Sequence, residues 1–164
     1  MRLLVVEDAA YVRDRLVSAI AQLEGIETIS QASKVSQAIH QFRSVRPDVV
    51  TLDIRLSEGS GIEVLETIKR ESPLTIVIMF TNLSTPLYRD RCARAGANYF
   101  FAKGEDFRGL LRLLSSMARI PRGKSSRPAT VAKSIAGKTS GRVVTRRILK
   151  PRAGTLEMLP LEAR

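Results

Sequence analysis

The chain has 164 residues, enough for one domain with a substantial hydrophobic core and an appendage. Its formal charge of +11 is uneven, because residues 1–119 carry 16 Lys/Arg against 14 Asp/Glu and residues 120–164 carry 11 against 2. No apolar run is long enough to cross a bilayer, the first expected strand starts too early to leave room for a signal peptide, and the single Cys92 cannot form an internal disulfide. We therefore expect a cytoplasmic protein.

The first half of the chain alternates short apolar runs with amphipathic stretches. Residues 3–6 predict a strand, and a helix opening at residue 8 or 9 ends at Gly25, a residue type that commonly follows a helix C-terminus. Residues 26–29 predict a second strand, and a second helix begins at Ser33 or Ser36. The apolar run over residues 48–53 has the character of a buried parallel strand.

Beyond residue 53 the same alternation continues as far as residue 117. A helix over residues 62–71 precedes a strand over 75–80. Thr85 and Pro86 suit the cap and first turn of a fourth helix that ends near residues 95–96. Residues 99–102 predict the last strand and residues 105–117 the last helix.

Five strands alternating with five helices predict an α/β fold, a doubly wound parallel sheet with helices on both faces. This domain should occupy residues 1–119. Residues 120–164 lose the periodicity and are rich in Ser, Thr, Gly, Pro, Ala and Lys/Arg. Such a composition cannot bury enough apolar surface to order itself, so we expect a basic, low-complexity and mostly disordered tail.

Polar and charged side chains stand where several of the strands end. Glu7 and Asp8 follow the first strand, Asp53 ends the third, and Thr81 and Lys103 follow the fourth and fifth. Carboxyl ends of parallel strands meet at one edge of the sheet, where ligands bind. Carboxylate oxygens near a phosphate favour Mg²⁺, and phosphoryl transfer needs a nucleophile, a metal and fixed positive charge. Asp53 is the central carboxylate free to act as the nucleophile and form an aspartyl phosphate.

These motifs, in this order and spacing, resemble a response-regulator receiver domain, as found in bacterial two-component and phosphorelay systems. The resemblance covers residues 1–119 and includes Ala95-Gly96-Ala97 leading to Phe100 and Lys103. It implies a flavodoxin-like fold with the strand order 2-1-3-4-5. It also implies a phosphoprotein that works as a signalling switch, with self-catalysed phosphorylation and dephosphorylation, rather than an enzyme acting on other substrates.

The resemblance implies a role for each matching residue. Asp53 would be the phosphoacceptor, and Lys103 would pair with the bound phosphoryl group. Mg²⁺ would be held by Asp8, Asp53 and the backbone carbonyl of Arg55, with Glu7 reaching it directly or through water. Thr81 would be the switch hydroxyl, and Phe100 the aromatic side chain that follows it.

The resemblance also implies partners. The phosphoryl donor would be a histidine kinase, a histidine phosphotransfer protein or a small acyl phosphate. The surface made by the fourth helix, fifth strand and fifth helix would bind an unknown downstream protein, and phosphorylation could be linked to dimerisation.

Several positions depart from the family pattern. Leu56-Ser57 replaces a common Met-Pro pair, and Gly104 follows Lys103 where Pro is common, so we expect a trans peptide there. Phe100 lacks the hydroxyl of a tyrosine. Arg55 and Leu83 occupy the two variable positions that tune phosphoryl lifetime in the family. No reacting group is lost.

Other functions stay open at this point. A doubly wound protein without chemistry, or an aspartyl-phosphate phosphatase, would share the fold, although the latter needs a second acid where Arg55 stands. A DNA-associated regulator is an alternative, because the basic tail could bind nucleic acid or an anionic membrane without sequence preference. The residues expected to make such contacts lie within one short segment: Arg142, Arg146, Arg147, Lys150 and Arg152.

Overall fold

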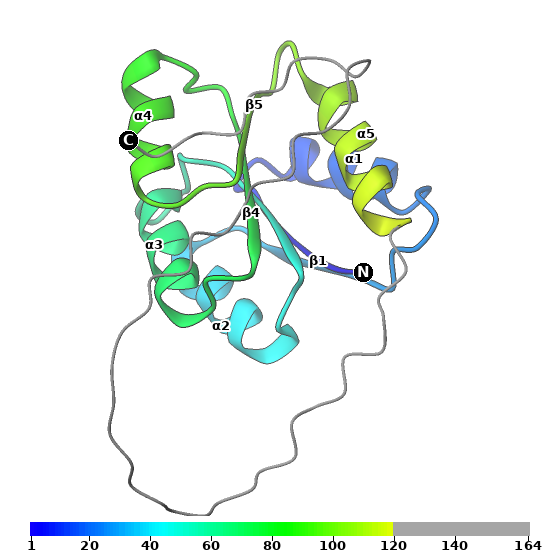
Figure 1. Cartoon of the computed structure of the whole chain (residues 1–164). Helices are drawn as coiled ribbons and strands as arrows, with labels where there is room; N and C mark the ends of the chain where they lie inside the picture. The colour runs from blue at the N-terminus through cyan, green and yellow to red at the C-terminus, as the bar shows by residue number, and fades with distance from the viewer. Residues whose placement is uncertain (120–164) are drawn as a thin grey trace, which may run out of the picture. The chain divides into compact units, whose positions relative to one another are not determined.

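The computed structural model describes residues 1–119, and these form a five-stranded sheet flanked by five helices (Figure 1). The elements in chain order are β1 Arg2–Val6, α1 Ala10–Ile20, β2 Thr28–Ala32, α2 Val35–Val45, β3 Val49–Leu52, α3 Gly61–Glu71, β4 Ile76–Thr81, α4 Pro86–Arg94, β5 Tyr99–Ala102 and α5 Phe107–Ala118. All neighbouring strands pair in parallel, in the order β2-β1-β3-β4-β5. The predicted flavodoxin-like fold and strand order are confirmed.

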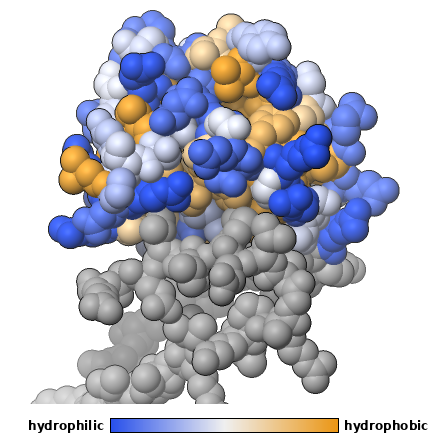
Figure 2. All heavy atoms as spheres, turned by 90° about the horizontal axis from the view of Figure 1, so that it is seen from above, coloured by the Kyte–Doolittle hydropathy of each residue, from blue (hydrophilic) through white to orange (hydrophobic). Residues whose placement is uncertain are grey.

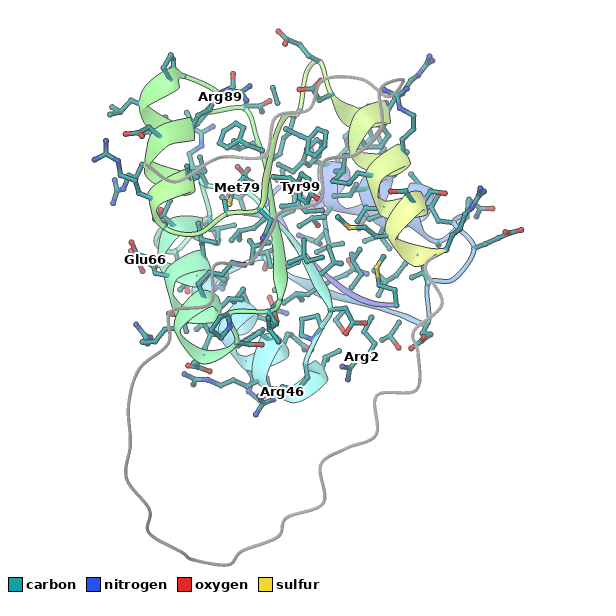
Figure 3. The ribbon with its side chains drawn as sticks, viewed as in Figure 1. Arg2, Arg46, Glu66, Met79, Arg89 and Tyr99 are labelled. Carbon is teal, nitrogen blue, oxygen red and sulfur yellow. The ribbon has the colours of Figure 1, made fainter. Side chains whose placement is uncertain are left out.

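Each face of the sheet carries its own hydrophobic cluster, because successive strand residues point to opposite sides. On β4, Val77 and Met79 join the cluster under α2, α3 and α4, whereas Ile78 and Phe80 join the cluster under α1 and α5. Met79 and Tyr99, labelled in Figure 3, belong to these two opposite clusters. The central strands are therefore apolar on both faces, as a doubly covered parallel sheet requires.

The predicted element bounds differ from the structure mainly around β2. The apolar residues 26–29 suggested a strand there, but β2 covers Thr28–Ala32 and pairs with β1 from Arg2 to Val6. Helix α1 ends at Ile20, and Gly25 lies in the following loop with φ of 82°. An edge strand has only one neighbour and a weak apolar pattern, so pairing with β1 decides its position.

The first turns of the helices agree with the expected cap signals in part. Thr85 is the residue before α4 and Pro86 opens it, although the Thr85 side chain makes no cap hydrogen bond. Ser60 caps α3 by accepting a hydrogen bond from the Ile62 N–H at 3.2 Å.

Cys92 is buried in the hydrophobic cluster under α2, α3 and α4. This burial raises the pKa of its thiol to about 11, so it is a packing residue.

The described residues include no helix long and apolar enough to cross a membrane. The expected boundary at residue 119 and the character of the tail stay predictions. Residues 120–164, with Arg142, Arg146, Arg147, Lys150 and Arg152, lie outside the described residues.

Candidate phosphoacceptor and metal site

Three carboxylates meet at the carboxyl edge of the sheet. Glu7 and Asp8 follow β1, Asp53 follows β3, and one oxygen of each lies within 4.8 Å of the others. Glu7 and Asp53 are buried, whereas Asp8 is partly exposed. Three like charges this close repel one another unless a cation joins them, and hard carboxylate oxygens suit Mg²⁺. The residues present therefore fit a divalent metal ion of this kind.

Lys103 supplies a positive charge to the same cluster from the end of β5. Its Nζ lies 2.6 Å from Asp53 Oδ2 and 2.5 Å from Glu7 Oε2, and only 9% of its side chain is exposed. Lys103 is positioned by its backbone N–H, which donates to the Thr81 carbonyl oxygen at 3.0 Å. No peptide bond among the described residues is cis, so the Lys103–Gly104 bond is trans, as predicted.

The surroundings of Glu7 change the pKa of its carboxyl. Its burial raises the pKa of the carboxyl above the ordinary value, while the Lys103 ammonium opposes this rise. The Glu7 side chain also accepts a hydrogen bond from the Ala9 N–H at 3.2 Å. The carboxylate is thus tied both to Lys103 and to the start of α1.

The loop after Asp53 is held close to the acid. The Arg55 N–H lies 3.4 Å from Asp53 Oδ1, and Arg55 pairs with Ser60 in an isolated β-bridge. The Gly61 N–H donates to the Ile54 carbonyl oxygen at 2.8 Å. At Gly61 a Cβ atom would lie only 1.9 Å from the Asp53 carbonyl oxygen, so no side chain fits there.

Thr81 ends β4 and is completely buried. Its Oγ1 accepts a hydrogen bond at 3.2 Å from the N–H of Leu83, which lies at the start of the β4–α4 loop. Leu83 and Phe100 both pack on the hydrophobic cluster under α2, α3 and α4, and Phe100 is partly exposed. The hydroxyl and the aromatic ring therefore belong to two strands that pair directly, β4 and β5.

Three residues of this region were missed by the sequence analysis. Gly61 was not singled out, and Arg13 and Arg89 entered only through the count of positive charges. The guanidinium of Arg89, labelled in Figure 3, lies 4.6 Å from the centre of the Phe100 ring and its Nε donates to the Ser84 carbonyl oxygen at 3.3 Å. A lone arginine on a helix carries no sequence signal for such a contact.

Figure 2 views the domain from above, the side on which Figure 1 places the β4–α4 and β5–α5 connections. Most of this face is hydrophilic, with smaller hydrophobic patches between the charged side chains.

Comparison with known proteins identifies the family. Residues 3–115 match the response regulator receiver domain. The chain is 37% identical over 105 residues to a protein-glutamate methylesterase/protein-glutamine glutaminase of Alkalilimnicola ehrlichii. The aligned region is 63% of the chain but only 27% of that enzyme. It is 29% identical over 102 residues to the chemotaxis protein CheY of Thermotoga maritima, covering 62% of the chain and 84% of that protein.

A solved structure gives the same result. The protein resembles one chain of the CheX-CheY-BeF3-Mg²⁺ complex of Borrelia burgdorferi, with a TM-score of 0.65 and 26% identity. The match covers 71% of the present chain and 88% of the chain in that complex. The chain therefore belongs to the response regulator receiver domain family, the phosphorylation-controlled signalling switches of two-component systems. The resemblance predicted from the motifs is confirmed.

Proposed function

We propose that Asp53 accepts a phosphoryl group and that this switches the domain between two conformations. The observation that carries the proposal is the position of Lys103 between Asp53 and Glu7, with Asp8 beside them. A metal-assisted phosphoryl acceptor needs a nucleophilic carboxylate, further acids to hold the metal and one fixed cation, and all of these are present. The similar CheX-CheY complex of Borrelia burgdorferi, solved with BeF3 and Mg²⁺, supports the same reaction class.

The transfer itself is a simple displacement. An oxygen of the Asp53 carboxylate attacks phosphorus, the bond from phosphorus to the donor breaks, and the donor leaves with the electron pair of that bond. Lys103 stabilises the negative charge on the transferred oxygens. Bound Mg²⁺, held by Asp8, Asp53, the Arg55 carbonyl and Glu7 directly or through water, would neutralise charge on the phosphoryl oxygens. Hydrolysis of the aspartyl phosphate returns Asp53 to its free form.

The test is the mass of the intact protein after incubation with acetyl phosphate and Mg²⁺. We expect a gain of one phosphate in the wild type that is lost in alkali, because acyl phosphates are labile, and no gain in Asp53→Asn. Omitting Mg²⁺ should nearly abolish the gain. A phosphate that persists in Asp53→Asn would show that another residue accepts it.

Thr81 would couple the phosphoryl group to the surface of α4, β5 and α5. Its hydroxyl now accepts the Leu83 N–H, and a hydrogen bond to the phosphoryl group would draw it away. The β4–α4 loop would then move, and with it the Ser84 carbonyl oxygen that accepts a hydrogen bond from Arg89. This movement would draw the Arg89 guanidinium away from the Phe100 ring. A ligand can move this equilibrium only by its differential affinity for the two states.

Thr81→Ala should therefore uncouple the switch without preventing phosphorylation. We expect beryllofluoride with Mg²⁺ to shift the amide NMR signals near Asp53 in this variant, while the shifts at Phe100 and along α4 largely disappear. Thr85→Ala is the matched control, since Thr85 makes no side-chain cap hydrogen bond. If α4 and Phe100 respond in Thr81→Ala as in the wild type, the coupling does not run through this hydroxyl.

The partners follow from the family and stay proposals. The donor would be a histidine kinase or a histidine phosphotransfer protein in the cytoplasm, and the downstream protein or a second copy of the chain would bind the α4–β5–α5 surface. We do not assign the activity of the methylesterase relative, because the chain spans 27% of its length. The high positive charge of residues 120–164 supports the further proposal of non-specific attraction to nucleic acid or anionic membranes.

A further inference from the structure

The loop that carries Glu7 and Asp8 connects β1 to α1 without a side-chain cap at the start of the helix. Ala9 precedes α1 and has no side-chain oxygen to cap it, so the helix begins without a side-chain cap. The Glu7 N–H is tied to the Ala32 carbonyl oxygen at 2.9 Å. The carbonyl groups of Glu7 and Asp8, at the end of the β1 ladder, need other partners.

Arg13 supplies these partners from one turn further along α1. Its Nη1 lies 2.9 Å from the Glu7 carbonyl oxygen and 3.4 Å from the Asp8 carbonyl oxygen. The side chain is partly buried, in contrast to the exposed Asp14 and Arg15 that follow it. One guanidinium therefore holds the backbone of Glu7 and Asp8, two of the three acids of the proposed metal site.

These hydrogen bonds go to backbone oxygens, so Arg13 itself occupies none of the carboxylate oxygens of Glu7 and Asp8. The guanidinium charge has two opposite effects on a metal. It repels a divalent cation through space, and it fixes the loop from which Asp8 reaches that cation. The sign of the change in metal affinity when the charge is removed tells which effect is larger.

We propose that Arg13 is a positioning residue for the divalent metal, and that this role outweighs its repulsion of the cation. The inference rests on the proposed function, since it requires the acidic cluster to bind Mg²⁺. Groups that orient metal ligands typically contribute about ten- to a hundredfold to the metal affinity. Loss of the two carbonyl contacts should thus weaken Mg²⁺ binding although a positive charge is lost.

The experiment is calorimetric titration of Mg²⁺ into the full chain at constant ionic strength, for the wild type, Arg13→Met, Arg13→Lys and Arg15→Met. We expect Arg13→Met to bind about tenfold more weakly than the wild type. Arg13→Lys should fall between them, because an ammonium group can reach one carbonyl. Arg15→Met removes the same charge from an exposed position over the Phe107 ring and should bind as tightly as the wild type or slightly more tightly.

Equal or tighter binding by Arg13→Met would overturn the inference, as would equal weakening in Arg13→Met and Arg15→Met. If Arg13→Met does not fold, Arg13→Lys decides the matter, because it keeps the charge and changes only the hydrogen-bond geometry. Unchanged affinity in Arg13→Lys would then contradict the positioning role. A wild type that binds no Mg²⁺ would instead refute the metal part of the proposed function, and the inference with it.

Discussion

Gly61→Ala should damage both the stability and the phosphorylation of the domain. The new Cβ atom would lie 1.9 Å from the Asp53 carbonyl oxygen and 2.9 Å from its carbon, and a backbone group cannot swing aside as a flexible side chain can. The start of α3 must move away from the end of β3. Overpacking of this kind costs 1–3 kcal/mol, and the backbone contact places Gly61→Ala at about 3 kcal/mol.

The same displacement should slow phosphorylation of Asp53 by about a hundredfold, since a misplacement of about 1 Å can have that effect on a reacting group. Urea unfolding and the rate of phosphorylation by acetyl phosphate measure the two effects. Gly104→Ala is the control, because a Cβ atom there would meet nothing within 4 Å. Similar behaviour of the two variants would mean that the contact between Gly61 and Asp53 is not the cause.

Lys103→Met should destabilise the metal-free domain by about 3 kcal/mol, the low end for breaking a buried ion pair. It would leave Glu7 and Asp53 buried together without the ammonium that now lies 2.5 and 2.6 Å from their oxygens. Excess Mg²⁺ should restore much of the lost stability, because a divalent cation can replace that charge. Urea unfolding in EDTA and in Mg²⁺ gives both values, and an equal loss in the two buffers would contradict this account.

Glu7→Gln is the companion variant and should act in the opposite direction. The pKa of Glu7 is raised in the folded protein, so the contribution of this carboxyl to stability falls as pH rises from its ordinary value of 4.5 through the raised pKa. A neutral glutamine avoids that loss. In EDTA we expect Glu7→Gln to exceed the wild type in stability at neutral pH, and the difference to disappear as pH falls toward 4.5.

The fold could be predicted from the sequence because its signals are local and repeated. The apolar runs of β1, β3 and β4 are buried on both faces, the acids and Thr81 stand where these strands end, and Lys103 follows β5. The bounds of β2 could not be predicted, since an edge strand takes its register from its neighbour rather than from its own residues. Long-range pairing leaves no trace in the periodicity of one segment.

The candidate site was predictable only as a set of side chains at strand ends. The contacts that hold them depend on three-dimensional distances: Gly61 against the Asp53 carbonyl, Arg13 on the acid pair, and Arg89 over Phe100. Glycine and arginine are frequent in loops and on helix surfaces, so their spacing does not reveal these roles. These contacts around the candidate site could therefore be identified only from the three-dimensional structure.

The central claim is that Asp53, rather than Asp8 or a hydroxyl group, takes the phosphoryl group. The most direct measurement is to treat the protein with acetyl phosphate and Mg²⁺, reduce it with borohydride, and map the product by peptide mass spectrometry. Borohydride converts an aspartyl phosphate to homoserine, so the account predicts homoserine at position 53 and unmodified aspartate at position 8. Homoserine at position 8, or a stable phosphate on serine or threonine with Asp53 unchanged, would contradict it.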